Sequence, residues 1–282
     1  MASSQQDPLP EPPPYVKYQG ILFPGLATKE SLEAMKTFEI RDDDVVIASY
    51  PKSGTMWTYH IVDEILEGKR DVSATRVMEC HVPQQAPAHL QYRKTPSPRL
   101  MQTHLPVQLA APGLSTPANK VKIVFVLRNP KDVCVSLYHF EQANPLLNTP
   151  ESWEQYTKDF LDGKLQYGDY FDHVLGWWQM KDDPHFLFIK HEDMKKDFPS
   201  SVKTIASFLE KELTDEHLAR VTTNCSLERM RKSLSDVAGK KNIVRKGIVG
   251  DWKNHFSGEE SAKFDQKYRE RMAGSGLEFE FE

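Results

Sequence analysis

Short apolar runs alternate with helical periodicities along this chain. The apolar runs cover residues 45–50, 121–127 and 186–189, and compact runs of this kind are typical of strands buried on both faces of a parallel sheet. Between them, apolar side chains recur at helical spacing in residues 55–66, 130–140 and 200–209. Strands that alternate with helices predict an α/β fold, in a single domain with a central parallel sheet flanked by helices.

The residues after the first predicted strand have the composition of an anion-binding loop. They read PKSGTMW (51–57) and follow the carboxyl end of a strand, where parallel sheets bind their ligands. The N–H groups at the start of a helix attract anions, Lys52 adds a cation, and Gly54 lets a ligand approach the backbone. The GxxxxGK[ST] pattern of ATP-binding loops is absent from the sequence, which argues against a kinase. An ordinary strand-to-helix turn with a surface lysine is the alternative.

Two further cationic segments lie farther along the chain. Arg128 directly follows the second predicted strand, and Ser136 lies about two turns into the helix after it. The forked donors of arginine match phosphate oxygens, although Arg128 can also pair with Asp132. Near the C-terminus, residues 245–247 read Arg-Lys-Gly, where two cations and a permissive backbone suit an anion. A solvated surface loop is the alternative there.

Composition narrows the class of partner. The 282 residues carry 36 Lys and Arg against 40 Asp and Glu, a net charge of −4, which argues against nucleic acid because nucleic-acid binding requires a basic face. Three cysteines without metal spacing predict free thiols in the cytoplasm, and no apolar run is long enough to predict a membrane helix. Residues 1–14 are rich in proline and predict a flexible leader before a domain formed by residues 15–282.

Three segments together resemble a known family. YPKSGTMW (50–57), RNPKDVCVSLYHF (128–140) and RKGIVGDWK (245–253) are similar, in content and order, to segments of the cytosolic sulfotransferases. The resemblance implies a P-loop-NTPase-like sulfotransferase fold. It also implies transfer of a sulfonate group from 3′-phosphoadenylyl sulfate (PAPS) to a hydroxyl or amine of a small, largely apolar acceptor such as a phenol, sterol, alcohol or amine. The product nucleotide would be PAP, and no metal is implied.

The same resemblance assigns roles to individual residues. His104, within MQTHLP (101–106), would be the general base, Lys52 would stabilise the leaving phosphate oxygen, and Ser136 would temper Lys52 in the resting complex. Trp57 would stack on the adenine. The residues implied to bind the nucleotide are Lys52, Ser53, Gly54, Thr55, Met56, Trp57, Arg128, Ser136, His191, Ser226, Arg245, Lys246 and Gly247.

Several positions depart from the family pattern. Gln102 stands where many members have a lysine beside the base, and loss of a charge-assisted contact costs about 1–3 kcal/mol. This substitution motivates the alternative function of a PAP- or PAPS-binding protein with weak or lost activity. His191 replaces a tyrosine at the adenine, and Leu227, Ile243 and Val244 replace larger residues there.

The oligomeric state and the acceptor site are less defined. The family's dimer motif KxxxTVxxxE is degraded in residues 253–262, so we expect a monomer or a weak homodimer. The acceptor pocket is expected from residues 80–100, with Val82, Pro83, Pro87, Leu90 and Tyr92, from residues 138–148, and from residues 237–243.

Overall fold

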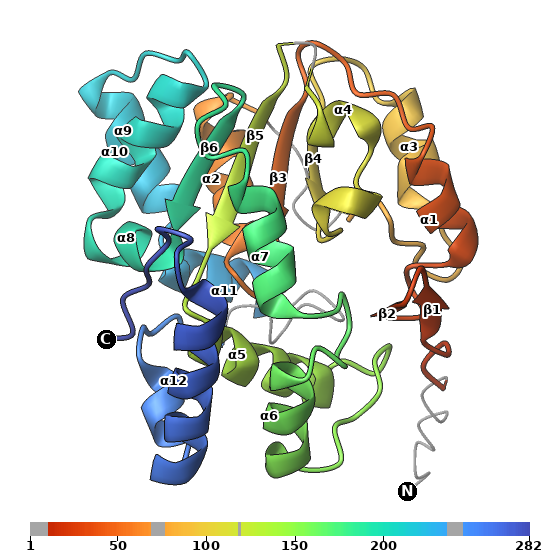
Figure 1. Cartoon of the computed structure of the whole chain (residues 1–282). Helices are drawn as coiled ribbons and strands as arrows, with labels where there is room; N and C mark the ends of the chain where they lie inside the picture. The colour runs from red at the N-terminus through yellow and green to blue at the C-terminus, as the bar shows by residue number, and fades with distance from the viewer. Residues whose placement is uncertain (1–10, 69–76, 118–119, 236–244) are drawn as a thin grey trace, which may run out of the picture.

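The fold is built on a parallel sheet of four strands. The computed structural model describes residues 11–68, 77–117, 120–235 and 245–282. The strands run in the order β4-β3-β5-β6, and all three pairings are parallel (Figure 1). Their bounds are Val45–Ser49 for β3, Leu100–Thr103 for β4, Lys122–Leu127 for β5 and Phe186–Lys190 for β6. The predicted α/β class and its central parallel sheet are confirmed.

The central strands owe their apolar composition to burial on both faces. Every residue of β3 is buried, and in β5 only Lys122 is partly exposed. Strand β6 forms one edge and is only partly buried. The opposite edge is β4, which pairs with β3 from Val45↔Leu100 to Ala48↔Thr103. The apolar pattern does not predict β4, whose segment is marked only by its resemblance to the family.

Two hydrophobic cores lie on the two faces of the sheet. One joins Ile47 and Val124 to the apolar side chains of α2, α9 and α10, and the other joins Val46 and Phe125 to those of α5, α7 and α12. In Figure 1, α7 crosses in front of the strands and α2 lies behind them. The α-helices are α1 Lys29–Met35, α2 Thr55–Ile65, α3 Ala88–Lys94, α4 Pro112–Ser115, α5 Pro130–Ala143, α6 Trp153–Leu161, α7 Tyr170–Trp178, α8 His191–Lys196, α9 Phe198–Phe208, α10 Asp215–Asn224, α11 Leu227–Ser235 and α12 Gly258–Met272.

The order of the strands creates a crevice at their carboxyl ends. After β3 the chain passes to β4 on one side, whereas β5 leads to β6 on the other side. The loops after β3 and β5 therefore diverge, and ligands of open α/β sheets bind at such a point. The remaining elements are an antiparallel hairpin of β1 Val16–Tyr18 and β2 Ile21–Phe23, and the 3₁₀ helices η2 Val107–Leu109 and η3 Asp251–Asn254.

Two sequence predictions fall at the ends of the chain. Most of the predicted leader, residues 1–14, lies outside the described residues. The degraded dimer motif lies at the start of α12, where Ser257 caps the helix and exchanges hydrogen bonds with Glu260 in a capping box. Lys253 of the same motif pairs with Glu282, with 2.8 Å between Nζ and Oε1. Across the residues that the structure describes, no helix has both the length and the apolar character needed to cross a membrane.

Candidate active site

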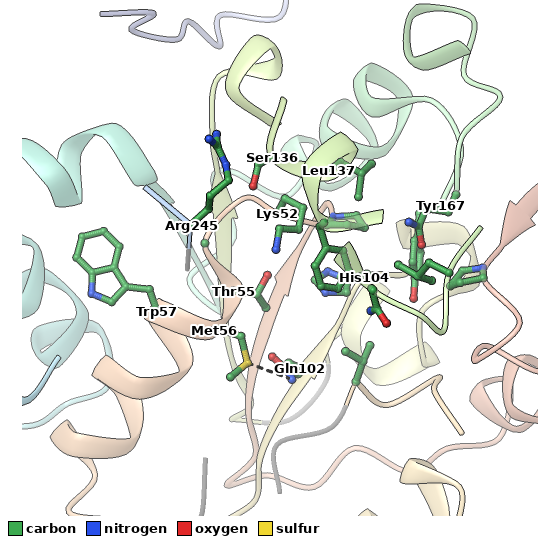
Figure 2. A pocket seen from close by; sticks show the side chains of 18 of the residues that line it. Lys52, Thr55, Met56, Trp57, Gln102, His104, Ser136, Leu137, Tyr167 and Arg245 are labelled. Carbon is green, nitrogen blue, oxygen red and sulfur yellow. Dashed lines mark hydrogen bonds between the residues drawn. The ribbon is translucent and has the colours of Figure 1, made fainter. Parts of the chain in front are cut away.

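Residues from all four strand ends meet at one cavity of about 430 Å³. Lys52 follows β3, His104 follows β4, Arg128 follows β5 and His191 follows β6, and each of them lines this cavity. Figure 2 shows Lys52 in the middle of the labelled side chains, with Arg245 and Ser136 on one side and His104 on the other. The sheet therefore brings together Lys52 and His191, which lie 139 positions apart in the sequence.

The loop between β3 and α2 leaves the start of the helix open. Lys52 and Gly54 both have positive φ angles, of 68° and 118°, so the chain turns sharply before α2. Gly54 is the N-cap, and because it has no side chain it cannot cap the first N–H groups of the helix. A side chain at residue 54 would lie 2.9 Å from His191 Nδ1, so glycine is required. Open N–H groups and a helix dipole at a cavity wall are suited to an anion.

Lys52 has an unusual environment for an amine. Its Nζ lies 4.0 Å from the centre of the Phe140 ring, a cation–π contact. Burial, with Arg128 and Arg245 nearby, lowers the pKa of Lys52 to about 7. An anion placed among these three cations would relieve their mutual repulsion and favour the charged form of Lys52. The electrostatics of the cavity therefore favour an anionic ligand.

Asp132 connects the second and third cationic segments. The predicted alternative, an Arg128–Asp132 pair, is present at 3.9 Å, but both carboxylate oxygens also accept backbone N–H groups from Gly250 and Trp252, at 2.9 and 3.0 Å. Arg128 donates to the carbonyl of Lys52 at 3.1 Å, and its buried Nε has no hydrogen-bond partner among the described residues. The arginine is thus held at the cavity with one donor still unsatisfied.

The C-terminal segment contributes two more cations. Arg245 and Lys246 both pair with Asp251, at 2.5 and 2.8 Å. Although burial opposes it, hydrogen bonds from Lys246 and Arg245 hold the pKa of this carboxyl well below its usual range. Gly247 has a φ of 65°, and a Cβ there would lie 2.7 Å from Leu227. The three residues of this segment line the cavity.

His104 is held as a neutral imidazole with a defined tautomer. Its Nδ1 lies 2.9 Å from the carbonyl oxygen of Ser49, and because a carbonyl only accepts, Nδ1 carries the hydrogen and Nε2 carries the lone pair. Burial lowers the pKa of His104 to about 4, and Lys52 lowers it further, against the bond to Ser49. At neutral pH the side chain can therefore accept a proton at Nε2.

The predicted adenine-contacting residues form one wall, with one exception. Trp57 donates to the carbonyl of Cys225 at 2.8 Å. The ring centres of Trp57 and His191 lie 5.3 Å apart, with an angle of 69° between the ring planes. His191 is only 4% exposed, and neither of its ring nitrogens has a hydrogen-bond partner within the described part of the chain. Trp57, His191 and Leu227 line the cavity, whereas Ser226 does not. The hydroxyl of Ser226, the residue before α11, instead accepts from the N–H of Arg229 at 3.4 Å.

Three other predicted positions have distinct outcomes. Ser53 is 1% exposed and does not line the cavity, and its N–H donates to the carbonyl of Tyr50 at 3.3 Å. Thr55 lines the cavity, and its hydroxyl lies 2.6 Å from that of Ser49. Met56 lines it too, and its sulfur lies 4.0 Å from Gln102 Nε2 (Figure 2).

The cavity includes only part of the segments predicted to bind the acceptor. Cys80, Val82 and residues of the 138–148 segment line the cavity, but Pro83, Pro87, Leu90 and Tyr92 do not. Leu90 and Tyr92 lie on α3. The structure adds Pro24, Leu26, Gln166 and Tyr167, which no local sequence pattern marked. The predicted segment 237–243, which includes Ile243, lies outside the described residues. Val244 lies outside them too. Within the described ranges, no group of three or more His, Cys, Asp or Glu is suited to a metal ion.

Comparison with known proteins gives a consistent result. The family model described as "Sulfotransferase domain" matches residues 42–276. The chain is 40% identical over 270 residues to sulfotransferase 1B1 of Canis lupus familiaris, covering 89% of this chain and 90% of that protein. It is 40% identical over 274 residues to the amine sulfotransferase of Oryctolagus cuniculus, covering 90% and 89%. The crystal structure of mouse sulfotransferase SULT7A1 complexed with PAP superposes with a TM-score of 0.83, at 32% identity and 93% and 96% coverage.

Proposed function

The chain belongs to the sulfotransferase family, and on that premise we propose that it transfers a sulfonate group from PAPS to a hydroxyl or amine of a small acceptor. One observation carries the proposal. His104, with its lone pair on Nε2, lines the same cavity as Lys52, Arg128, Arg245 and Lys246. A base and a cluster of cations in one cavity suit a reaction between a neutral acceptor and a polyanionic donor.

The fit of the nucleotide rests on unsatisfied groups of this chain. The start of α2 has no side-chain cap, and the buried Nε of Arg128 and both ring nitrogens of His191 have no hydrogen-bond partner among the described residues. Such groups are costly when they are buried and unpaired. A ligand with a phosphate at α2, a second phosphate near Arg128 and Arg245, and a polar base beside His191 and Trp57 would satisfy them. PAP and PAPS have this chemistry, and mouse SULT7A1 was crystallised with PAP.

The proposed mechanism follows from these positions. His104 Nε2 takes the acceptor proton while the acceptor oxygen forms a bond to sulfur. The bond between sulfur and the phosphate oxygen breaks, and its electron pair stays on that oxygen. Lys52 stabilises the charge that develops there, and Ser136, on α5 at the same cavity, tempers Lys52 before the acceptor arrives. His104 then returns its proton to solvent.

A direct assay tests this proposal. The purified full chain is incubated with PAPS and a panel of phenols, sterols, alcohols and amines, without added metal, and PAP release and sulfated product are measured. We expect sulfation of at least one acceptor in proportion to PAP release. Tight PAP binding without turnover of any acceptor would contradict the proposed activity and favour a nucleotide-binding protein instead. Size-exclusion chromatography establishes whether the chain is a monomer or a dimer, and the assay is run on that form.

The cytoplasmic location and a domain that spans residues 15–282 remain predictions.

Binding of PAP should depend on pH through Lys52. Its pKa of about 7 in the free protein means that the amine is charged below pH 7 and increasingly neutral above it. PAP favours the charged form, so binding above pH 7 takes up a proton, and affinity falls by up to tenfold per pH unit. Calorimetry between pH 6 and 9, in buffers of different ionisation enthalpy, measures this uptake. The K52M variant is the control, and equal proton uptake by K52M would contradict the assignment to Lys52.

Substitution of Gln102 tests whether the chain is an active enzyme or a nucleotide-binding protein with weak or lost activity. Its side chain is 3% exposed and lines the cavity, and its Oε1 has no hydrogen-bond partner in the described structure. A hydrogen bond from a charged donor is stronger than one from a neutral donor by about 1 kcal/mol. The Q102K variant should therefore raise the turnover number about fivefold at pH 6.5. The isosteric Q102M variant, which donates nothing, should lower it. No gain in Q102K would indicate that the existing cations already supply the charge.

A further inference from the structure

The backbone of His104 is held by a side chain from a distant loop. Glu79, which is fully buried, accepts the N–H of His104 at 2.8 Å through Oε1. Its Oε2 accepts the hydroxyl of Thr103 at 2.9 Å. Burial raises the pKa of Glu79 to about 7, against hydrogen bonds from His104, Thr103 and Tyr167. A buried carboxyl is costly, so its placement beneath the turn after β4 requires an explanation.

A second restraint acts on the carbonyl of the same residue. His173, on α7, has its Nε2 2.8 Å from the carbonyl oxygen of His104. Because that oxygen accepts, Nε2 carries the hydrogen, and the buried Nδ1 has no hydrogen-bond partner among the described residues. Burial lowers the pKa of His173 to about 4, so the ring is neutral. It is wedged edge-on against Tyr50, with ring centres 5.3 Å apart.

The three contacts together determine where Nε2 of His104 points. Glu79 fixes the N–H of His104, His173 fixes its carbonyl, and the Ser49 carbonyl fixes Nδ1. With both ends of the residue and one ring atom held, little freedom remains for the imidazole. Catalytic groups must be held within about 0.5 Å of the productive geometry, and a base on an unrestrained turn at a sheet edge would not meet this requirement.

We propose that Glu79 and His173 are positioning residues that clamp the main chain of His104 and thereby fix the tautomer and direction of its imidazole. The proposal rests on the proposed function for the role of His104 as the base. It does not assign either residue any contact with substrate. The plain alternative is that both side chains satisfy the polar backbone of a buried turn, and so contribute to stability alone.

The chain offers matched variants that separate these two roles. H173L removes the donor to the His104 carbonyl, whereas H173Q retains an N–H at a similar distance from the backbone. E79L and E79Q form the corresponding pair on the other side. W177F is the control, because Trp177 lies on the same helix and donates to the next carbonyl, that of Leu105, at 3.1 Å. It removes a hydrogen bond of the same kind without touching His104.

Three measurements are made on each full-length variant. They are the turnover number at saturating PAPS, PAP affinity by calorimetry, and the tautomer of His104 from ¹⁵N imidazole spectra assigned with H104A. We expect H173L and E79L to lower turnover about 10- to 100-fold, to leave PAP affinity unchanged, and to replace the single Nδ1–H tautomer with an exchanging mixture. H173Q and E79Q should recover most of the turnover, and W177F should lower Tm alone.

The outcomes separate failure of the clamp from failure of the proposed function. Turnover and a single tautomer that survive in H173L and E79L would overturn the clamp, as would a loss of turnover in W177F equal to that in H173L. If H173L and E79L do not fold, H173Q and E79Q decide the question. These two variants are expected to keep the hydrogen bonds to the backbone of His104, so a mixture of tautomers in both would overturn the clamp. If the wild-type chain sulfates no acceptor, the proposed function fails, and the tautomer spectra alone still support or overturn the clamp.

Discussion

Replacing His104 with alanine should abolish most of the sulfotransferase activity. Loss of a general base costs about 10²- to 10⁴-fold in rate, and the other histidine among the described residues that line the cavity, His191, follows β6 rather than β4. PAP affinity should remain unchanged, since His104 is assigned to the acceptor side of the reaction. The turnover number of H104A at saturating PAPS and acceptor, together with PAP binding by calorimetry, measures both effects.

Two controls make the result for His104 specific. His217 also bonds to a backbone carbonyl, that of Glu64, at 3.2 Å, and does not line the cavity, so H217A should retain wild-type turnover. Added imidazole should restore part of the activity of H104A, because the vacated space lies within the cavity. An H104A variant that is fully active, or one that loses PAP binding in proportion to turnover, would show that His104 is not the base.

The pattern of apolar residues predicts the centre of the sheet better than its edge. Residues 45–50 and 121–127 are apolar throughout because β3 and β5 are covered on both faces. Strand β4 has only four residues and contains the buried, polar Gln102. No local periodicity identifies so short a strand, and its existence depends on pairing with β3. The position of His104 at a strand end therefore could not be predicted from apolar pattern.

Some residues of the site can be predicted from their neighbours in sequence, whereas others reach the site only through tertiary packing. The loop after β3 is predictable because Lys52 and Gly54 lie two positions apart in sequence, directly before a helix start. Residues such as Glu79 and Tyr167 reach the site through tertiary packing. Tyr167 has a φ of 64° and lines the cavity, yet its sequence neighbourhood is that of any turn. Resemblance to a family supplied the role of His104, and the tautomer that suits this role became visible only through its bond to Ser49.

Removing the charge of Lys52 should produce the second large loss of activity. The K52M variant retains the length and apolar stem of the side chain but not the ammonium group. Loss of one group that stabilises developing charge typically costs about 10²- to 10³-fold in turnover. Because Lys52 is expected to act most strongly on the oxygen that gains charge as the sulfur–oxygen bond breaks, the turnover number should fall by more than the PAP affinity does. Steady-state kinetics at pH 6.5, where Lys52 is mostly charged, measure this difference.

Lys246 provides the matched comparison for this test. It lines the same cavity and is one of its four described cations, but it is exposed and lies in the C-terminal segment beside Asp251. K246M also removes one positive charge, but Lys246 is expected to bind a phosphate that does not react. The variant should therefore raise KM for PAPS and leave the turnover number unchanged. The kinetic split between the two variants is what the mechanism requires, because only a group at the reacting oxygen binds the transition state better than the substrate. Equal effects of K52M and K246M on turnover and KM would refute a catalytic role for Lys52 and reduce it to one more cation in the nucleotide site.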